Sequence, residues 1–204
     1  AGQTRIQAVK TKTPYTITVI NKNLENPWAI SVMPDGRFLI TQKPGTMVIL
    51  NANGTLAKTI TGLPKVDDSG QGGLLDVTLA PDFAKSRMVY WAYSEPQSKG
   101  VLLAIAKGKL AANETAIENQ TIIYRATPAH TGKLQYGSRI VFDKNGNLYA
   151  GNFGDGVITK IEFYSDGKVK SKKVVFDSDK LKCCDGFFYD KKRNSIFIAN
   201  YENN

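Results

Sequence analysis

The chain has a small supply of catalytic bases and soft metal ligands. Its 204 residues include one histidine, His130, and two cysteines, the adjacent Cys183 and Cys184. Neither an all-cysteine zinc site nor a paired cysteine and histidine site can be built from these within one chain. His130 is the only imidazole base, and it lies in the segment Thr127 to Gly132, which has the composition of a loop.

The two cysteines leave several possibilities open. In an oxidising compartment they could close into a strained ring, although ordinary disulfides join α-carbons that lie farther apart. Two free thiols on alternating faces of a strand, or a bridge to another chain, are the alternatives. We favour free thiols, which a mass measurement before and after reduction would distinguish from a disulfide.

Oxygen ligands are spaced in a more suggestive way. Four side chains lie near the ends of predicted strands: Asn152, Asp155, Asp185 and Asn200. Oxygen ligands of this kind suit calcium if the fold brings them to one place. Asn and Asp are also the ordinary turn residues of hairpins, so a purely structural role stays open.

An internal repeat indicates the fold that must position these residues. Four segments each read as an apolar strand, a tight polar turn and a second apolar strand: residues 28–41, 76–93, 139–150 and 186–199. Their turn positions Pro34, Pro81, Asp143 and Asp190 follow one another at 47, 62 and 47 residues. This spacing is typical of propeller blades, so we predict an all-β fold, a β-propeller of four-stranded antiparallel blades.

The repeat also predicts the domain organisation. A lead, residues 1–14, precedes a single propeller domain, residues 15–204, with blades at 28–61, 74–126 and 138–176 and a partial blade at 185–204. This makes about 3.5 blades. Residues 15–20 have strand composition and could complete the last blade of a closed four-bladed ring. The alternative is a truncated six-bladed propeller with an edge that another chain would have to cover.

Charge and hydropathy exclude some classes of protein. The net charge is +9, and its densest cluster is Lys168, Lys170, Lys172 and Lys173, whose alternation is typical of an exposed outer strand. No basic patch is interleaved with aromatic residues, so we expect no nucleic-acid partner. No apolar run is long enough to insert in a membrane. The chain opens without Met or a hydrophobic signal core, which favours a mature exported protein, secreted or periplasmic.

Three stretches carry a family resemblance. Residues 26–41 (NPWAISVMPDGRFLIT), 70–83 (GQGGLLDVTLAPDF) and 135–142 (QYGSRIVF) resemble the soluble quinoprotein sugar dehydrogenases. The resemblance covers residues 15–150 and implies a six-bladed exported propeller that holds pyrroloquinoline quinone (PQQ) and calcium, oxidises a sugar and passes electrons to an acceptor. It also implies that Gln71 and Arg139 contact the substrate or cofactor.

One position departs from the family pattern. Members of the family place a histidine directly before the aromatic-Gly-x-Arg motif, where it takes the proton of the C1 hydroxyl of the sugar. Here that position is Gln135, an amide with no basic lone pair. His130 lies five residues earlier, and its loop could fold it back over the site. The catalytic candidates are therefore His130 and Gln135.

Beyond residue 150 the sequence looks more like the NHL and sugar-lactonase class of propellers, which use calcium to polarise an ester carbonyl. Three hypotheses follow. The first is a PQQ-dependent dehydrogenase acting on an aldose. The second is a propeller that binds a sugar without turnover, and the third is a calcium-dependent sugar lactonase.

Overall fold

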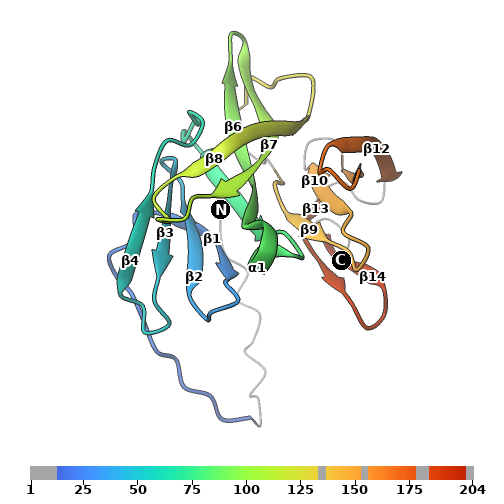
Figure 1. Cartoon of the computed structure of the whole chain (residues 1–204). Coiled ribbons are helices and arrows are strands. Elements are labelled where there is room, and N and C mark those ends of the chain that lie inside the picture. The colour runs from blue at the N-terminus through green and yellow to red at the C-terminus, as the bar shows by residue number, and fades with distance from the viewer. Residues whose placement is uncertain (1–12, 133–136, 153–155, 178–183, 201–204) are drawn as a thin grey trace.

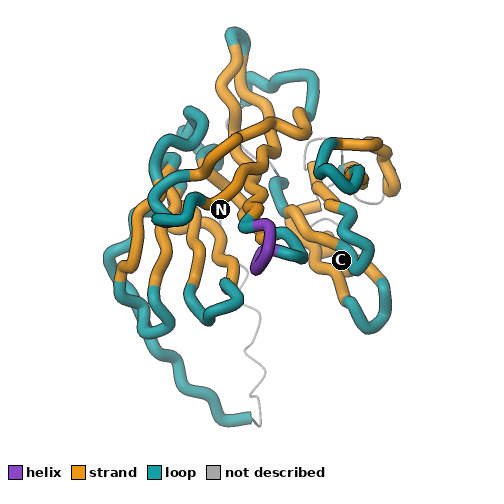
Figure 2. The backbone as a smooth tube through the Cα atoms, in the orientation of Figure 1, coloured by secondary structure: helices purple, strands orange, loops and turns teal. Residues whose placement is uncertain are grey.

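The repeat folds into four antiparallel sheets, as the computed structural model shows for residues 13–132, 137–152, 156–177 and 184–200 (Figures 1 and 2). Three sheets have four strands and the fourth has two. Blade 1 holds β1 (Pro27–Val32), β2 (Phe38–Gln42), β3 (Thr46–Leu50) and β4 (Leu56–Ile60). Blade 2 holds β5 (Leu74–Leu79), β6 (Met88–Gln97), β7 (Gly100–Leu110) and β8 (Ile117–Arg125), with a short helix α1 (Phe83–Ser86) between β5 and β6. Blade 3 holds β9 (Ile140–Phe142), β10 (Leu148–Asn152), β11 (Val157–Phe163) and β12 (Val169–Phe176), and β13 (Cys184–Asp190) pairs with β14 (Ser195–Asn200). The predicted all-β propeller class is confirmed.

Turn chemistry fixes the hairpins that the repeat predicts. In the β1–β2 turn Gly36 has φ +83°, a conformation that only glycine adopts without strain, and its N–H donates to the carbonyl of Met33 at 2.9 Å. In the β9–β10 turn Gly146 has φ +78°. There the Asp143 carboxylate accepts the backbone N–H groups of Asn145 and Asn147 at 2.8 and 2.9 Å. These local bonds set the register of the strands on either side.

The four sheets follow one another along an arc, with the first strand of each packed against the first strand of the next (Figure 1). Polar side chains fix this stacking at two boundaries. The Thr41 hydroxyl of β2 donates to the carbonyl of Leu75 in β5 at 2.6 Å. Between blades 2 and 3 the Asp76 carboxylate of β5 accepts the backbone N–H of Ile140 in β9 at 2.7 Å.

The apolar core lies between the sheets because blade 2 buries both of its faces. On the blade 1 side the fully buried Trp91 packs in a cluster with Leu39 and Met47. On the blade 3 side Tyr90 meets the ring of Phe142 edge-on, with centroids 4.9 Å apart. A sheet that is covered on both faces needs apolar residues at successive positions, which explains the continuous buried run in β6 and β7.

The hypothesis that residues 15–20 close the ring is wrong. They form no strand, and Tyr15, Ile17, Val19 and Ile20 are exposed. The segment lies against blade 1, where the Asn21 amide donates to the carbonyl of Gly54 at 2.7 Å. The Ile20 carbonyl is so close to Gly54 that a Cβ there would lie 2.1 Å from it. Alternating β-branched residues favour extended backbone, but they do not supply a partner strand.

The outer strand β12 has the exposed lysines that the sequence predicts: Lys170, Lys172 and Lys173 face solvent, as does Lys168 directly before the strand. In the part of the chain that the structure describes, no helix has the length and apolarity that a membrane crossing requires.

Candidate functional site

One end of the sheets gathers most of the candidate residues. At this end β1, β5 and β9 begin, and we name it the mouth. Three contacts define it: Pro27 pairs with Gln42 across β1 and β2, the N–H of Leu74 donates to the carbonyl of Lys43 at 2.9 Å, and the N–H of Ile140 reaches Asp76. The loop that carries Gln71 and the residue Arg139 each come directly before a strand that begins here.

A rigid glycine loop presents Gln71 at the mouth. Gly70 has φ +58° and Gly73 has φ +131°. A Cβ on Gly72 would lie 2.3 Å from the carbonyl of Asp67, and one on Gly73 would lie 2.5 Å from the carbonyl of Lys43. The loop therefore requires glycine at positions 72 and 73, because neighbouring backbone occupies the space that a side chain would need.

Ser94 and Lys43 hold this loop from two sides. The Ser94 hydroxyl accepts the N–H of Gly73 at 2.6 Å and donates to the carbonyl of Asp67 at 2.5 Å. The Lys43 ammonium group donates to the carbonyl of Gly70 at 2.7 Å. Gln71 itself is exposed to solvent. Its amide can therefore reach a ligand from a backbone that is already fixed.

His130 lies at the same end of blade 2. Its backbone pairs with Val101 through two hydrogen bonds of 2.8 Å, beside the turn between β6 and β7, and its side chain is exposed. Gly100 allows this close approach, since a Cβ there would lie 2.2 Å from the carbonyl of His130. Gln135, at the position of the family's base, lies outside the described residues.

Arg139 forms a salt bridge with a buried carboxylate that the sequence analysis missed. Its Nη1 lies 3.2 Å from Asp76 Oδ1, and the Asp76 side chain is 1% exposed. Burial raises the pKa of Asp76 to about 6, against the opposing effects of Arg139 and of the Ile140 and Val77 N–H groups. One signal could have indicated it: Asp76 is the single charged residue within the apolar strand β5.

Arg139 and Trp28 line the same cavity. Its volume is about 340 Å³, and most of its other lining residues are apolar, among them Pro27, Ile30 and Ile40. A guanidinium at the edge of an apolar cavity suits a ligand with a flat apolar body and an anionic group. Sequence reasoning pointed to Arg139 but not to its proximity to β1.

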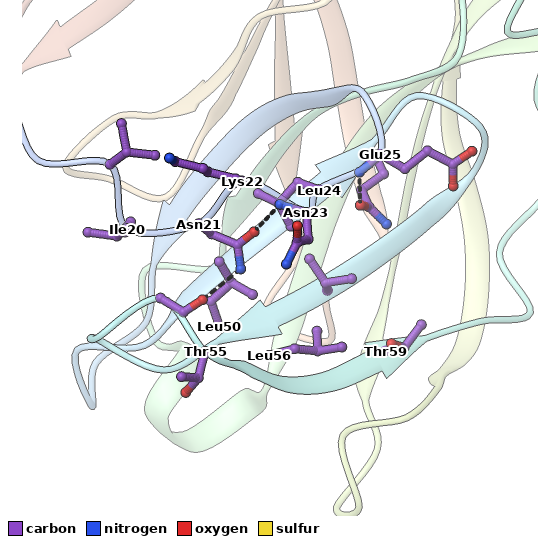
Figure 3. A pocket seen from close by; sticks show the side chains of 14 residues that line it. Ile20, Asn21, Lys22, Asn23, Leu24, Glu25, Leu50, Thr55, Leu56 and Thr59 are labelled. Atoms are coloured by element: carbon purple, nitrogen blue, oxygen red, sulfur yellow. Dashed lines mark hydrogen bonds between the residues drawn. The ribbon is translucent and has the colours of Figure 1, made fainter.

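A larger cavity of about 820 Å³ lies between residues 19–25 and the outer strands of blade 1 (Figure 3). It shares Ile20, Asn21, Leu24 and Leu50 with the smaller cavity but is not lined by Arg139 or Trp28. Two of its polar side chains, Asn21 and Gln42, are already hydrogen-bonded. The Asn21 amide bonds to the backbone of Asn23 and Gly54, and Gln42 accepts the N–H of Glu25 at 2.6 Å. These bonds fix the segment over blade 1.

The predicted calcium ligands are only partly described. Asn152 ends β10, Asn200 ends β14, and Asp185 is the second residue of β13. Asn200 pairs with Cys184 at the start of β13. Asp155 and Cys183 lie outside the described residues, as do the side chains of Asn152, Cys184, Asp185 and Asn200. Elsewhere in the described chain no group of three or more His, Cys, Asp or Glu residues could hold a metal ion.

Two buried tyrosines of β6, Tyr93 near the mouth and Tyr90 farther along the strand, are poor candidate bases. Burial raises the pKa of Tyr93 to about 12, with a further increase from the Glu95 carboxylate. Burial likewise raises the pKa of Tyr90 to about 12. Both phenols stay protonated at neutral pH.

Comparison with known sequences matches this chain to a family model, glucose/sorbosone dehydrogenase, over residues 24–166. The match includes the Gln71 loop and the segment from Gln135 to Arg139, and it continues past residue 150. The aldose sugar dehydrogenase YliI of Escherichia coli (strain K12) is 36% identical over 135 residues, 65% of this chain. The aligned part is 36% of the length of that enzyme.

Two solved structures share the fold. The soluble aldose sugar dehydrogenase of Escherichia coli, in its apo form, matches with a TM-score of 0.74 at 24% identity, over 90% of this chain and 59% of the other. The PQQ-bound aldose sugar dehydrogenase of Streptomyces coelicolor matches with a TM-score of 0.70 at 20% identity, over 92% of this chain and 60% of the other. At these identities the structural likeness concerns the fold alone.

Proposed function

Because this chain belongs to the glucose/sorbosone dehydrogenase family, we propose that it acts in the oxidation of an aldose at its C1 hydroxyl, with PQQ as hydride acceptor. The observation that carries the proposal is the family match over the Gln71 loop and the Gln135 to Arg139 segment. The fixed position of the Gln71 loop at the mouth supports it.

The lining of the 340 Å³ cavity is compatible with the cofactor. PQQ is a planar aromatic molecule with three carboxylates, so it combines the flat body and the negative charge that Trp28 and Arg139 suit. When bound, the quinone supplies the acceptor for the hydride that leaves C1. Arg139 would hold a carboxylate, and Trp28 would cover part of an apolar face.

The remaining proton requires a base from the protein. In this proposal Gln71 and Gln135 hold sugar hydroxyls by hydrogen bonds, and His130 accepts the C1 hydroxyl proton as hydride leaves the same carbon. Only the imidazole of His130 has a basic lone pair, since both amides lack one. The products are then a lactone, the reduced quinone and a protonated base.

Calcium belongs to the same proposal. Asn152, Asp155, Asp185 and Asn200 offer the oxygen ligands that calcium prefers. Hydrolysis of a sugar lactone with the same metal, the third hypothesis, stays a prediction that a chelator-sensitive hydrolysis assay would test. An electron acceptor for the reduced quinone and export of the chain also remain proposals.

The test is reconstitution of the whole chain with PQQ and calcium, followed by reduction of an artificial dye in the presence of aldoses. We expect turnover that requires the quinone and falls at least tenfold in Gln71→Ala, since a lost hydrogen bond in the transition state typically costs this much. Gln120→Ala, which replaces an exposed glutamine in the outer strand β8, is the matched control. Dye reduction no faster than with a boiled sample would refute the dehydrogenase for this chain.

A second candidate is a propeller that binds a sugar without oxidising it. The observation in its favour is the amide at Gln135, because two amides bind a hydroxyl but accept no proton. Calorimetric titration with aldoses separates the two candidates. Heat of binding with no dye reduction in the reconstituted protein supports the binding propeller, and binding with turnover supports the dehydrogenase.

A further inference from the structure

Asp76 is a carboxylate enclosed between blades 2 and 3. Its Oδ1 accepts the N–H of Val77 at 3.0 Å and Arg139 Nη1 at 3.2 Å, and its Oδ2 accepts the N–H of Ile140 at 2.7 Å. A charge in such a place costs stability unless several partners compensate it. Packing alone would be served as well by an apolar side chain, so the carboxylate calls for a specific role.

The partners of Asp76 point to that role. Ile140 is the first residue of β9, and Arg139 comes directly before it. The carbonyl of Arg139 accepts the N–H of Gly151 at 3.1 Å, which fixes its backbone to β10. Its side chain is 43% exposed and lines the cavity with Trp28. One carboxylate thus binds both the backbone that carries Arg139 and the guanidinium itself.

We propose that Asp76 is a positioning residue: it aims the Arg139 guanidinium into the cavity shared with Trp28, where the cation binds an anionic group of the ligand. For PQQ as that ligand the inference rests on the proposed function. The orientation of the Arg139 guanidinium does not rest on the proposed function, because it depends only on contacts within the chain. Among the described residues Arg139 is the one charged side chain that acts on Asp76.

A positioning role and a simple charge effect predict opposite changes in the attraction of an anion to the cavity when Asp76 is replaced. Replacement of Asp76 by Asn removes a negative charge next to the cavity, so the field alone would attract an anion more strongly. If Asp76 instead aims Arg139, the variant attracts the anion less, because the guanidinium is no longer held at the cavity.

The first experiment uses iodide quenching of tryptophan fluorescence and needs no quinone. The chain has two tryptophans, and Trp91 is fully buried, so iodide reports on Trp28. At constant ionic strength and neutral pH we expect the iodide quenching constant to fall about twofold in Asp76→Asn, in Arg139→Gln and in the double variant alike. Quenching by neutral acrylamide should stay unchanged.

The second experiment measures PQQ binding by titration. Each single substitution should weaken affinity about tenfold, and the double variant no more than either, because both changes remove one interaction. Glu114→Gln, which breaks an ion pair between blades 1 and 2, is the control for stability alone and should keep the affinity of the wild type. If the wild type binds no PQQ, the proposed function fails while the iodide experiment still tests Asp76.

Unchanged or increased iodide quenching in Asp76→Asn would overturn the inference. If that variant fails to fold, a second test leaves Asp76 in place and removes its charge by protonation at low pH. The protein for this test carries His130→Gln, which removes the chain's only imidazole. Iodide quenching should then fall as the pH drops from 7.5 to 5, and a constant that stays level or rises would equally overturn the inference.

Discussion

Arg37 and Glu114 form a two-pronged ion pair that joins blade 1 to blade 2, with Nη1 to Oε2 at 2.6 Å and Nη2 to Oε1 at 2.8 Å. The residues are 77 positions apart and lie in the β1–β2 turn and the turn after β7. Asp35 holds the guanidinium from the other side at 2.7 Å. Because the guanidinium is planar and its donors are fixed relative to one another, the pair loses little side-chain entropy when it forms. It therefore contributes more to stability than an ordinary surface ion pair.

We therefore predict that Glu114→Gln lowers the free energy of unfolding by about 1 kcal/mol at neutral pH. Hydrogen bonds to Arg37 hold the pKa of Glu114 below its usual value, so this contribution is present above about pH 4.5 and is lost as the pH falls through the lowered pKa. Urea unfolding from pH 3 to 7 measures it. Glu118→Gln, an exposed change in the same blade, should leave the stability unchanged at every pH.

The contribution of Asp76 to the free energy of unfolding should change with pH in the opposite direction to that of Glu114. Burial raises its pKa to about 6 from 3.8, so the folded protein binds this proton more tightly than the unfolded chain. Between about pH 4 and 6, rising pH should lower the free energy of unfolding through this group by up to about 1.4 kcal/mol per unit, with no further effect above pH 6. The stability of the wild type relative to Asp76→Asn should fall across this range. A difference that is independent of pH would contradict the raised pKa.

Gly73→Ala should destabilise the protein by about 3 kcal/mol, because φ +131° and the Lys43 carbonyl both exclude a methyl group. Thermal unfolding measures the loss. Gly132→Ala, at a position where a Cβ meets nothing within 4 Å, is the control and should change the stability by less than about 0.5 kcal/mol. Equal effects of the two substitutions would mean that the Gln71 loop tolerates another conformation.

Gln135→His should increase dye reduction in the reconstituted protein, by about a hundredfold if proton transfer limits the rate. The substitution puts an imidazole at the position of the family's base. Lys172→His adds an imidazole at an exposed position of the outer strand β12, outside the motif, and should leave the rate unchanged. A Gln135→His variant with the rate of the wild type would argue that another step limits turnover.

The sequence alone was sufficient for much of the fold. Apolar segments paired through turns such as Met33 to Arg37 predicted the hairpins that the structure forms. These features depend on bonds between residues a few positions apart. Composition misled only at residues 15–20, where an alternating pattern without a partner strand stays an exposed segment.

The candidate site was less accessible to sequence reasoning. The motifs predicted Gln71 and Arg139 as contact residues, which stays a prediction. Asp76 could not be predicted, because its partner Ile140 lies 64 residues away. Likewise nothing in the order of residues places Arg139 beside Trp28.

The sequence by itself determined the repeat, the hairpins and the family, because periodicity and turn chemistry act between neighbours in the chain. Only the tertiary structure decided which charges meet, since Asp76 with Arg139 and Arg37 with Glu114 become neighbours only when whole sheets pack against each other. A buried charge is tolerated only where packing supplies its partners, so its position depends on the assembled blades.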